Sequence, residues 1–128
     1  MEYGNLMNEQ NSKKIIDSCP LLFNRSFYFE CGDGWVDILI ELCTKIKTHL
    51  QTLSDEDVKL IVVDQVKQKY GTLRFYVSYE DDVINDLIKN AMQKSAQICE
   101  QCGAEGKLRG DSWIYCACDA HTDKKDLM

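Results

Sequence analysis

Three cysteines and one histidine in the last quarter of the chain have the spacing of a metal site. Cys99 and Cys102 are separated by two residues, and after fifteen more residues Cys118 and His121 repeat that spacing. Two intervening residues let paired side chains converge on one ion from a tight turn, and Gly103 stands where such a turn needs positive φ. Zn²⁺ prefers four sulfur and nitrogen ligands in a tetrahedral set. The pattern therefore predicts a zinc site.

The segment between the two ligand pairs contains Gly106, Gly110 and an apolar run at 113–115. We expect it to form a hairpin that returns the chain to the metal, as in a treble-clef or zinc-ribbon finger. Cys116 could take the place of Cys118 as a ligand, because alternation along a strand would point both thiols to the same face. The symmetry of the two pairs favours Cys118.

Catalytic chemistry is not indicated. Four protein ligands leave no position on the metal for a catalytic water, so we expect a structural zinc. His49 lies at the end of a predicted helix, where we expect it to be exposed to solvent. Cys31 has no recognisable base, and the run at 32–34 lacks the rest of a phosphate-binding glycine motif. We therefore predict that the protein is not an enzyme.

A second group of polar residues surrounds a predicted β-hairpin. With a two-residue loop at 70–71, Lys67 lies directly opposite Arg74. Like charges across a strand pair are destabilising, so an acidic group should compensate. Glu30 and Asp33 are candidates from within the chain. An anionic ligand or an acidic partner is the other possibility.

The string around Asp33 has two interpretations. In the first, Asp33 caps the following helix and Trp35 belongs to the core. In the second, polar groups converge beside an aromatic wall, which is typical of a ligand pocket. The candidate ligand-binding residues of that pocket are Glu30, Asp33, Trp35, Lys67, Lys69, Arg74 and Tyr76.

The helices and strands that we expect to position these side chains form an α+β fold. We expect, in order, a short strand at 26–31, a helix at 35–50, a β-hairpin at 59–79, a helix from 80 to 98, and the finger. Residues 58–66 would also suit a helix, but the β-branched run at 61–63 favours a strand. A loop at Tyr70 and Gly71 predicts the pairs Lys69–Thr72, Lys67–Arg74, Val66–Phe75 and Gln65–Tyr76.

The chain divides into four predicted parts, which are a flexible N-terminal segment at 1–18, an α+β core at 19–98, the zinc finger at 99–121 and a tail at 122–128. No stretch is apolar enough for a membrane span, and residues 1–18 lack the features of a secretory signal. The seven cysteines therefore indicate metal binding rather than disulfides, and we expect a cytoplasmic protein.

Three strings in this order resemble a widespread family of small bacterial and prophage proteins that has no established function. They are FECGDGW at 29–35, QVKQKYGTLRFY at 65–76, and the C-terminal CxxCG and CxxH pairs. The resemblance covers residues 19–121 and implies the fold and a zinc ion. In that family the final pair is also Cys-x₂-His after a strand with a tryptophan, which supports Cys118 and His121 and makes Cys116 a departure.

These observations support three hypotheses about function. The first is a non-catalytic protein-binding module. The resemblance to prophage proteins suggests an inhibitor of host defence or an immunity protein that acts in the host cytoplasm. The second is a binder of an anionic, nucleotide-like molecule at Lys67, Arg74 and Trp35. The third, a nucleic-acid-binding finger, is disfavoured because the net charge is −6 and the finger offers only Lys107 and Arg109 between its ligand pairs.

Overall fold

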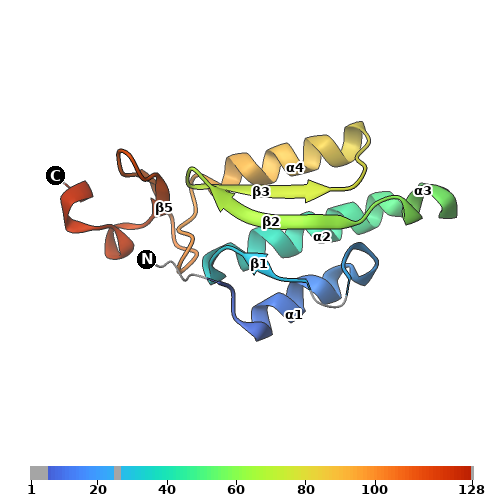
Figure 1. Cartoon of the computed structure of the whole chain (residues 1–128), viewed down its shortest axis with the longest axis horizontal. Coiled ribbons are helices and arrows are strands. Elements are labelled where there is room, and N and C mark those ends of the chain that lie inside the picture. Colours follow the sequence, from blue (N-terminus) through green and yellow to red (C-terminus); the bar gives the residue numbers. More distant parts are fainter. Residues whose placement is uncertain (1–5, 25–26, 128) are drawn as a thin grey trace.

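A three-stranded mixed sheet organises most of the chain in the computed structural model, which describes residues 6–24 and 27–127 (Figure 1). The short strand β1 (Phe29–Glu30) runs parallel to β2 (Val63–Lys69), and β2 pairs antiparallel with β3 (Thr72–Val77). Helices α2 (Val36–Leu50) and α4 (Asp82–Ser95) lie beside this sheet, and α1 (Glu9–Ser18) packs on α2 (Figure 1). The predicted α+β class is confirmed. Of the strand expected at 26–31, residue 26 lies outside the described residues, and only Phe29–Glu30 of the others form β1.

The β2–β3 hairpin has the register that the sequence predicts. Its loop residues Tyr70 and Gly71 both have positive φ, at 55° and 81°, as a tight two-residue hairpin turn requires. The strand begins at Val63 rather than 59, because α3 (Asp55–Lys59) precedes it and is capped by the Ser54 side chain. The observed pairs include Lys69–Thr72, Lys67–Arg74, Val66–Phe75 and Gln65–Tyr76.

The core lies between the sheet and its helices. Helix α2 (Val36–Leu50) packs against both α1 and α4 (Asp82–Ser95), and α4 packs against β3. Apolar side chains recur on α2 at helical spacing, which places one stripe of them in the interior. The largest fully buried side chains include Ile15, Leu22, Phe29, Trp35, Leu39, Ile46, Ile61, Val66, Leu73 and Ile84.

One polar contact joins the end of α2 to the start of α4. The Asp81 carboxylate accepts a hydrogen bond from the Ile84 amide at 2.9 Å and so caps α4. Its second oxygen lies 2.6 Å from His49 Nε2. The prediction that His49 is exposed is therefore wrong, because this contact leaves only 16% of its side chain exposed.

The N-terminal segment is ordered where a flexible one was predicted. Residues 9–18 form α1 (Glu9–Ser18), whose Ile15 side chain is fully buried in the core. Asn8 caps this helix, and Asp33 Oδ1 accepts hydrogen bonds from the Asn8 amide and from Asn11 Nδ2. Because tertiary contacts stabilise α1, its polar composition was misleading. Residues 1–5 of the predicted segment lie outside the described residues.

These contacts also correct the role predicted for Asp33. It begins the 3₁₀ helix η2 (Asp33–Trp35), and α2 starts directly after it without a side-chain cap. The carboxylate is instead used by α1, from a sequence distance of more than twenty residues. A favoured capping residue thus serves a different helix from the one that its position suggests.

The finger follows α4 at the end of the sheet where the β2–β3 turn lies (Figure 1). Its hairpin consists of β4 (Lys107–Arg109) and β5 (Tyr115–Ala117), followed by two 3₁₀ helices, η3 (Asp119–His121) and η4 (Lys124–Leu127). Gly71 at the β2–β3 turn touches the finger, since a Cβ added there would lie 2.7 Å from the Leu108 side chain. No helix among the described residues has both the length and the hydrophobicity to cross a membrane.

Candidate metal centre

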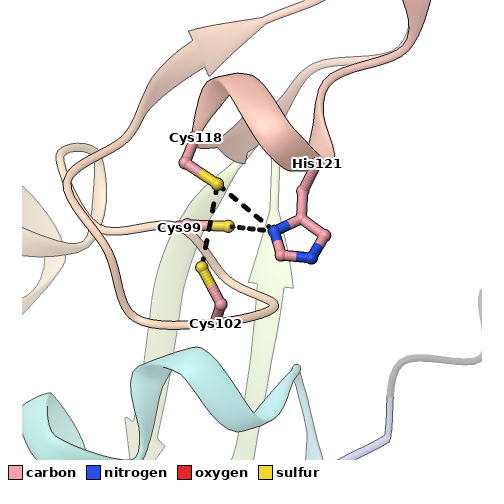
Figure 2. Close-up of side chains that lie close together, drawn as sticks. All are labelled: Cys99, Cys102, Cys118 and His121. Carbon is pink, nitrogen blue, oxygen red and sulfur yellow. Dashed lines mark hydrogen bonds between the residues drawn. The ribbon is translucent and has the colours of Figure 1, made fainter.

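The four predicted ligands lie together. Their donor atoms, Sγ of Cys99, Cys102 and Cys118 and a ring nitrogen of His121, are all within 4.8 Å of one another. Figure 2 shows the four side chains pointing toward one another, with Nδ1 of His121 as the nitrogen that faces the sulfurs. The separations that the figure marks are 3.7 Å from Cys102 to Cys118, 3.6 Å from Cys99 to His121 and 3.2 Å from Cys118 to His121. This Cys₃His group can hold a metal ion.

A tight turn presents the first ligand pair. The Gly103 amide donates to the Cys99 carbonyl at 2.9 Å, and the Cys99 amide donates to the Ala104 carbonyl at 2.8 Å. Gly103 has a φ of 84°, as predicted from its place after the second thiol. We call residues 99–103 the knuckle.

Hydrogen bonds at the knuckle lower the pKa of one of its thiols. Burial alone would raise the pKa of Cys99, but hydrogen bonds from the backbone amides of Cys118, Cys102 and Gln101 outweigh burial and lower it to about 7. Metals bind the thiolate rather than the thiol, so these amides favour the form that a metal needs. The pKa of Cys102 is raised: the Ala104 amide lowers it, but burial and the thiols of Cys118 and Cys99 prevail.

The second pair comes from the end of β5 and the following turn. Cys118 directly precedes η3, and that short helix brings His121 back so that its amide donates to the Cys118 carbonyl. Strand alternation ends at Ala117, so Cys116 and Cys118 do not share a direction. Cys116 is buried, its thiol donates to the Ile98 carbonyl at 3.2 Å, and burial raises its pKa to about 11. The structure thus places Cys118 in the group and Cys116 outside it.

The knuckle docks on the glycine-rich turn that precedes α2. Glu100 Oε2 accepts a hydrogen bond from the Gly32 amide at 2.8 Å, and the Glu100 carbonyl accepts one from the Gly34 amide at 2.7 Å. The Trp35 indole N–H donates to the Ile98 carbonyl at 2.9 Å, one residue before the first ligand. Three hydrogen bonds therefore fix the candidate metal centre to the α+β core.

Close packing explains the two glycines of this turn. A Cβ at Gly34 would lie 2.1 Å from the Cys99 carbonyl oxygen and 2.6 Å from the Gly103 amide nitrogen. A Cβ at Gly32 would lie 2.5 Å from the Glu100 carbonyl oxygen. Both contacts are with backbone atoms, which cannot rotate away, so only glycine permits this approach. The FECGDGW string is thus a docking surface for the knuckle.

Most of the predicted ligand-binding residues do lie on one face of the sheet. Lys67 and Arg74 are cross-strand partners, and Glu30 is the β1 partner of Lys67 in the parallel ladder. Tyr76 is 42% exposed on the same face as Arg74, two residues along β3. Glu30 accepts a hydrogen bond from Gln65 at 3.2 Å. Lys69 is exposed beside the turn, where its ammonium lies 5.8 Å from the centroid of the Tyr70 ring.

Two of the predicted ligand-binding residues do not belong to that face. Trp35 is wholly buried, and its only polar atom bonds to the Ile98 carbonyl. The Asp33 carboxylate is engaged by α1. The prediction that these two side chains line a ligand pocket beside Lys67 and Arg74 is therefore wrong, and the first interpretation of Trp35, as a core residue, is confirmed.

Several residues that build the centre were missed by sequence reasoning. In the sequence, nothing distinguishes Glu100 from other residues between the first two predicted ligands. Its role in docking the knuckle is seen only in the structure, where its carboxylate is buried against the Gly32 amide. Burial raises the Glu100 pKa, against the opposing effect of the Gly32 amide. Arg109 donates to the Ala117 carbonyl at 3.2 Å and to Asp119 at 2.6 Å, so it braces the finger. Of the two cations between the ligand pairs, Lys107 is the exposed one.

Comparison with known proteins gives no relative for this chain: no protein-family model, no curated protein and no solved structure matches it.

Proposed function

We propose that the protein is a non-catalytic protein-binding module whose finger is held by a structural zinc ion. The donor geometry supports zinc. Bonds of about 2.3 Å to sulfur and 2.0–2.1 Å to nitrogen in a regular tetrahedron place two sulfurs about 3.8 Å apart and a sulfur and a nitrogen about 3.6 Å apart. Two of the marked separations, 3.7 and 3.6 Å, match these values, and the third, at 3.2 Å, is slightly shorter.

The composition of the donor set supports an architectural role for the metal. Three thiolates and one imidazole complete a tetrahedral shell, so no position remains for a water or a substrate. The finger has only two short strands of its own, and its binding free energy for the metal would be folding free energy. The ion therefore holds together a part of the chain that has little core.

The observation that carries the binding role is the exposure of large apolar side chains on this metal-held finger. Leu108 is 47% exposed and Trp113 is 67% exposed on the finger, and Leu127, in the adjoining helix η4, is 51% exposed. Tryptophan is enriched at protein interfaces, where it supplies much of the binding energy. A metal-held hairpin with such side chains on and beside it suits a partner protein better than a small substrate.

The setting that we propose is the cytoplasm, where thiols stay reduced and available to a metal. The resemblance to small bacterial and prophage proteins, together with a net charge of −6, supports an inhibitor of a host defence system or an immunity protein. Either role requires stable binding to one partner and no catalysis.

The proposal is tested by metal analysis and by co-purification. Elemental analysis of the purified chain is expected to give one zinc per molecule, and chelation is expected to lower the melting temperature. The zinc-loaded chain should retain a stable protein partner that a Cys102→Ser/Cys118→Ser variant loses. Absence of stoichiometric metal would contradict the structural zinc, and absence of any stable partner would contradict the protein-binding role.

One observation favours a second candidate, an anionic ligand on the open face of the sheet. Arg74 Nε is buried without a hydrogen-bond partner among the described residues, and Lys67 lies directly across from it. An anion would satisfy both groups. Calorimetry with nucleotides and cyclic nucleotides tests this role, with Arg74→Ala as the variant that should abolish binding. No heat with any of them, or equal heat in the variant, would exclude it.

A further inference from the structure

The finger and the helix η4 that follows it border a cleft of about 370 Å³, and none of the four candidate metal ligands lines it. The β4–β5 loop forms one wall and the C-terminal 3₁₀ helix η4 with the residue before it forms the other. The lining side chains include Asp111, Trp113, Tyr115, Asp123, Lys125 and Asp126.

Hydrogen bonds of the Tyr115 hydroxyl connect the two walls of the cleft. Its hydroxyl donates to the Asp126 carboxylate and accepts a hydrogen bond from the Asp123 amide at 3.0 Å. The Asp126 amide in turn donates to the Asp123 carbonyl at 2.9 Å. These hydrogen bonds hold the two walls together before any ligand binds, which lowers the entropic cost of binding.

The charges that line the cleft are predominantly negative. Asp111, Asp123 and Asp126 stand against the single ammonium of Lys125. Asp111 and Asp123 are exposed and make no side-chain hydrogen bond or ion pair within the described residues. They are thus available to a cationic group from outside, and the net charge of −6 would attract one.

An aromatic face completes this set. Trp113 is 67% exposed at the cleft, whereas Trp35, the other tryptophan of the chain, is wholly buried. An exposed indole attracts an ammonium or guanidinium group over its ring, and tryptophan does so best among the aromatic residues. Carboxylates beside an open indole are complementary to a basic side chain.

We propose that this cleft binds a lysine or arginine side chain within a basic segment of a partner protein, with the cation over Trp113 and between Asp111 and Asp123. The inference rests on the proposed protein-binding function and specifies the partner's chemistry. A metal ion is the other cation to consider. Among the described residues, the one group of three or more His, Cys, Asp or Glu side chains that is close enough to hold a metal is the Cys₃His group, so the three aspartates of the cleft do not form such a group.

The test uses the zinc-loaded full chain and a fluorescein-labelled hexa-arginine peptide at near-physiological salt. Anisotropy of the label measures the affinity. Trp113→Ala and the Asp111→Asn/Asp123→Asn double variant are each expected to weaken binding about fivefold or more, from the loss of the cation–π and charge contacts. In the unlabelled complex, tryptophan emission should change, since Trp113 is the exposed indole.

Matched controls separate the cleft from general electrostatics. Glu56→Gln/Glu80→Gln removes the same charge from exposed positions outside the cleft, and Tyr28→Ala removes an aromatic side chain that is 76% exposed elsewhere. Both should bind within about twofold of the parent. Equal weakening by the matched double variant would overturn the proposal, as would unchanged binding in Trp113→Ala. Displacement of the peptide by millimolar Ca²⁺ or Mg²⁺ at constant ionic strength would assign the cleft to a metal instead.

The outcomes also distinguish this inference from the proposed function. If a co-purifying protein binds the parent and the cleft variants equally, the protein-binding module stands and the cleft is not its contact. If no protein co-purifies but the peptide depends on Trp113 and the two aspartates, the cation site stands and the binding-module role fails.

Discussion

The Glu100 carboxylate and the Gly32 amide, 68 residues apart, form a buried hydrogen bond of 2.8 Å. Glu100 stands between the first two candidate metal ligands, and Gly32 belongs to the turn that precedes α2. The bond is shielded from water, since Glu100 is only 8% exposed. It therefore ties the finger to the α+β core, and the two parts should gain stability from each other.

Glu100→Ala is expected to destabilise the protein by about 1–3 kcal/mol, because it leaves the buried Gly32 amide without an acceptor. Urea unfolding of the zinc-loaded chain measures the change in the free energy of unfolding. The matched control is Glu105→Ala in the same finger, where the side chain is exposed and the effect should stay within about 0.5 kcal/mol. Equal values for the two variants would contradict the docking role of Glu100.

Gly34→Ala should separate the knuckle from the core. The added Cβ would lie 2.1 Å from the Cys99 carbonyl oxygen, so the backbone must move, at a cost of about 1–3 kcal/mol or more. Thermal unfolding and competition with a chelator should show lower stability and weaker metal retention together. Ser112→Ala, at an exposed position of the β4–β5 loop, is the control. A variant with parental stability and metal affinity would show that the turn does not need glycine.

Local patterns predicted the parts of the fold that depend on neighbours in the sequence. The loop at Tyr70 and Gly71 determines the hairpin register, because its length and its positive φ values leave one pairing. The metal group was predictable for the same reason, since each ligand pair is separated by two residues.

Contacts between distant segments were not predictable in this way. The α1 helix depends on Asp33, whose carboxylate binds the Asn8 amide across 25 residues, so the polar segment gave no sign of order. The two glycines near Asp33 indicated a turn, but not that the knuckle would pack on it. Trp35 was assigned both to the core and to a ligand pocket, and only its complete burial decides between them.

The assignment of Cys118 rather than Cys116 as a ligand gives a paired prediction. Cys118→Ser should lose most of the bound zinc, because a donor atom of the group is removed. Cys116→Ser should keep one zinc per molecule, because its thiol bonds to the Ile98 carbonyl and a hydroxyl can do the same. Elemental analysis after exposure to a mild chelator measures both. Zinc loss in Cys116→Ser with retention in Cys118→Ser would reverse the assignment.

The contact of Asp81 with α4 and His49 predicts a pH-dependent contribution to stability. Burial alone would raise the Asp81 pKa, but hydrogen bonds from the Ile84 amide and from His49 outweigh it and hold the pKa below its usual value. A carboxylate with a lowered folded-state pKa stabilises the fold above its unfolded pKa of about 3.9, and this contribution is lost as the pH falls through the folded-state value.

Asp81→Ala should therefore cost about 1 kcal/mol at pH 7, the usual loss for a helix cap, and progressively less below about pH 4. Urea unfolding of both proteins from pH 7 to pH 3 measures the difference, with the exposed Asp55→Ala as a control at the start of α3. A difference that grows as the pH falls would contradict the sign.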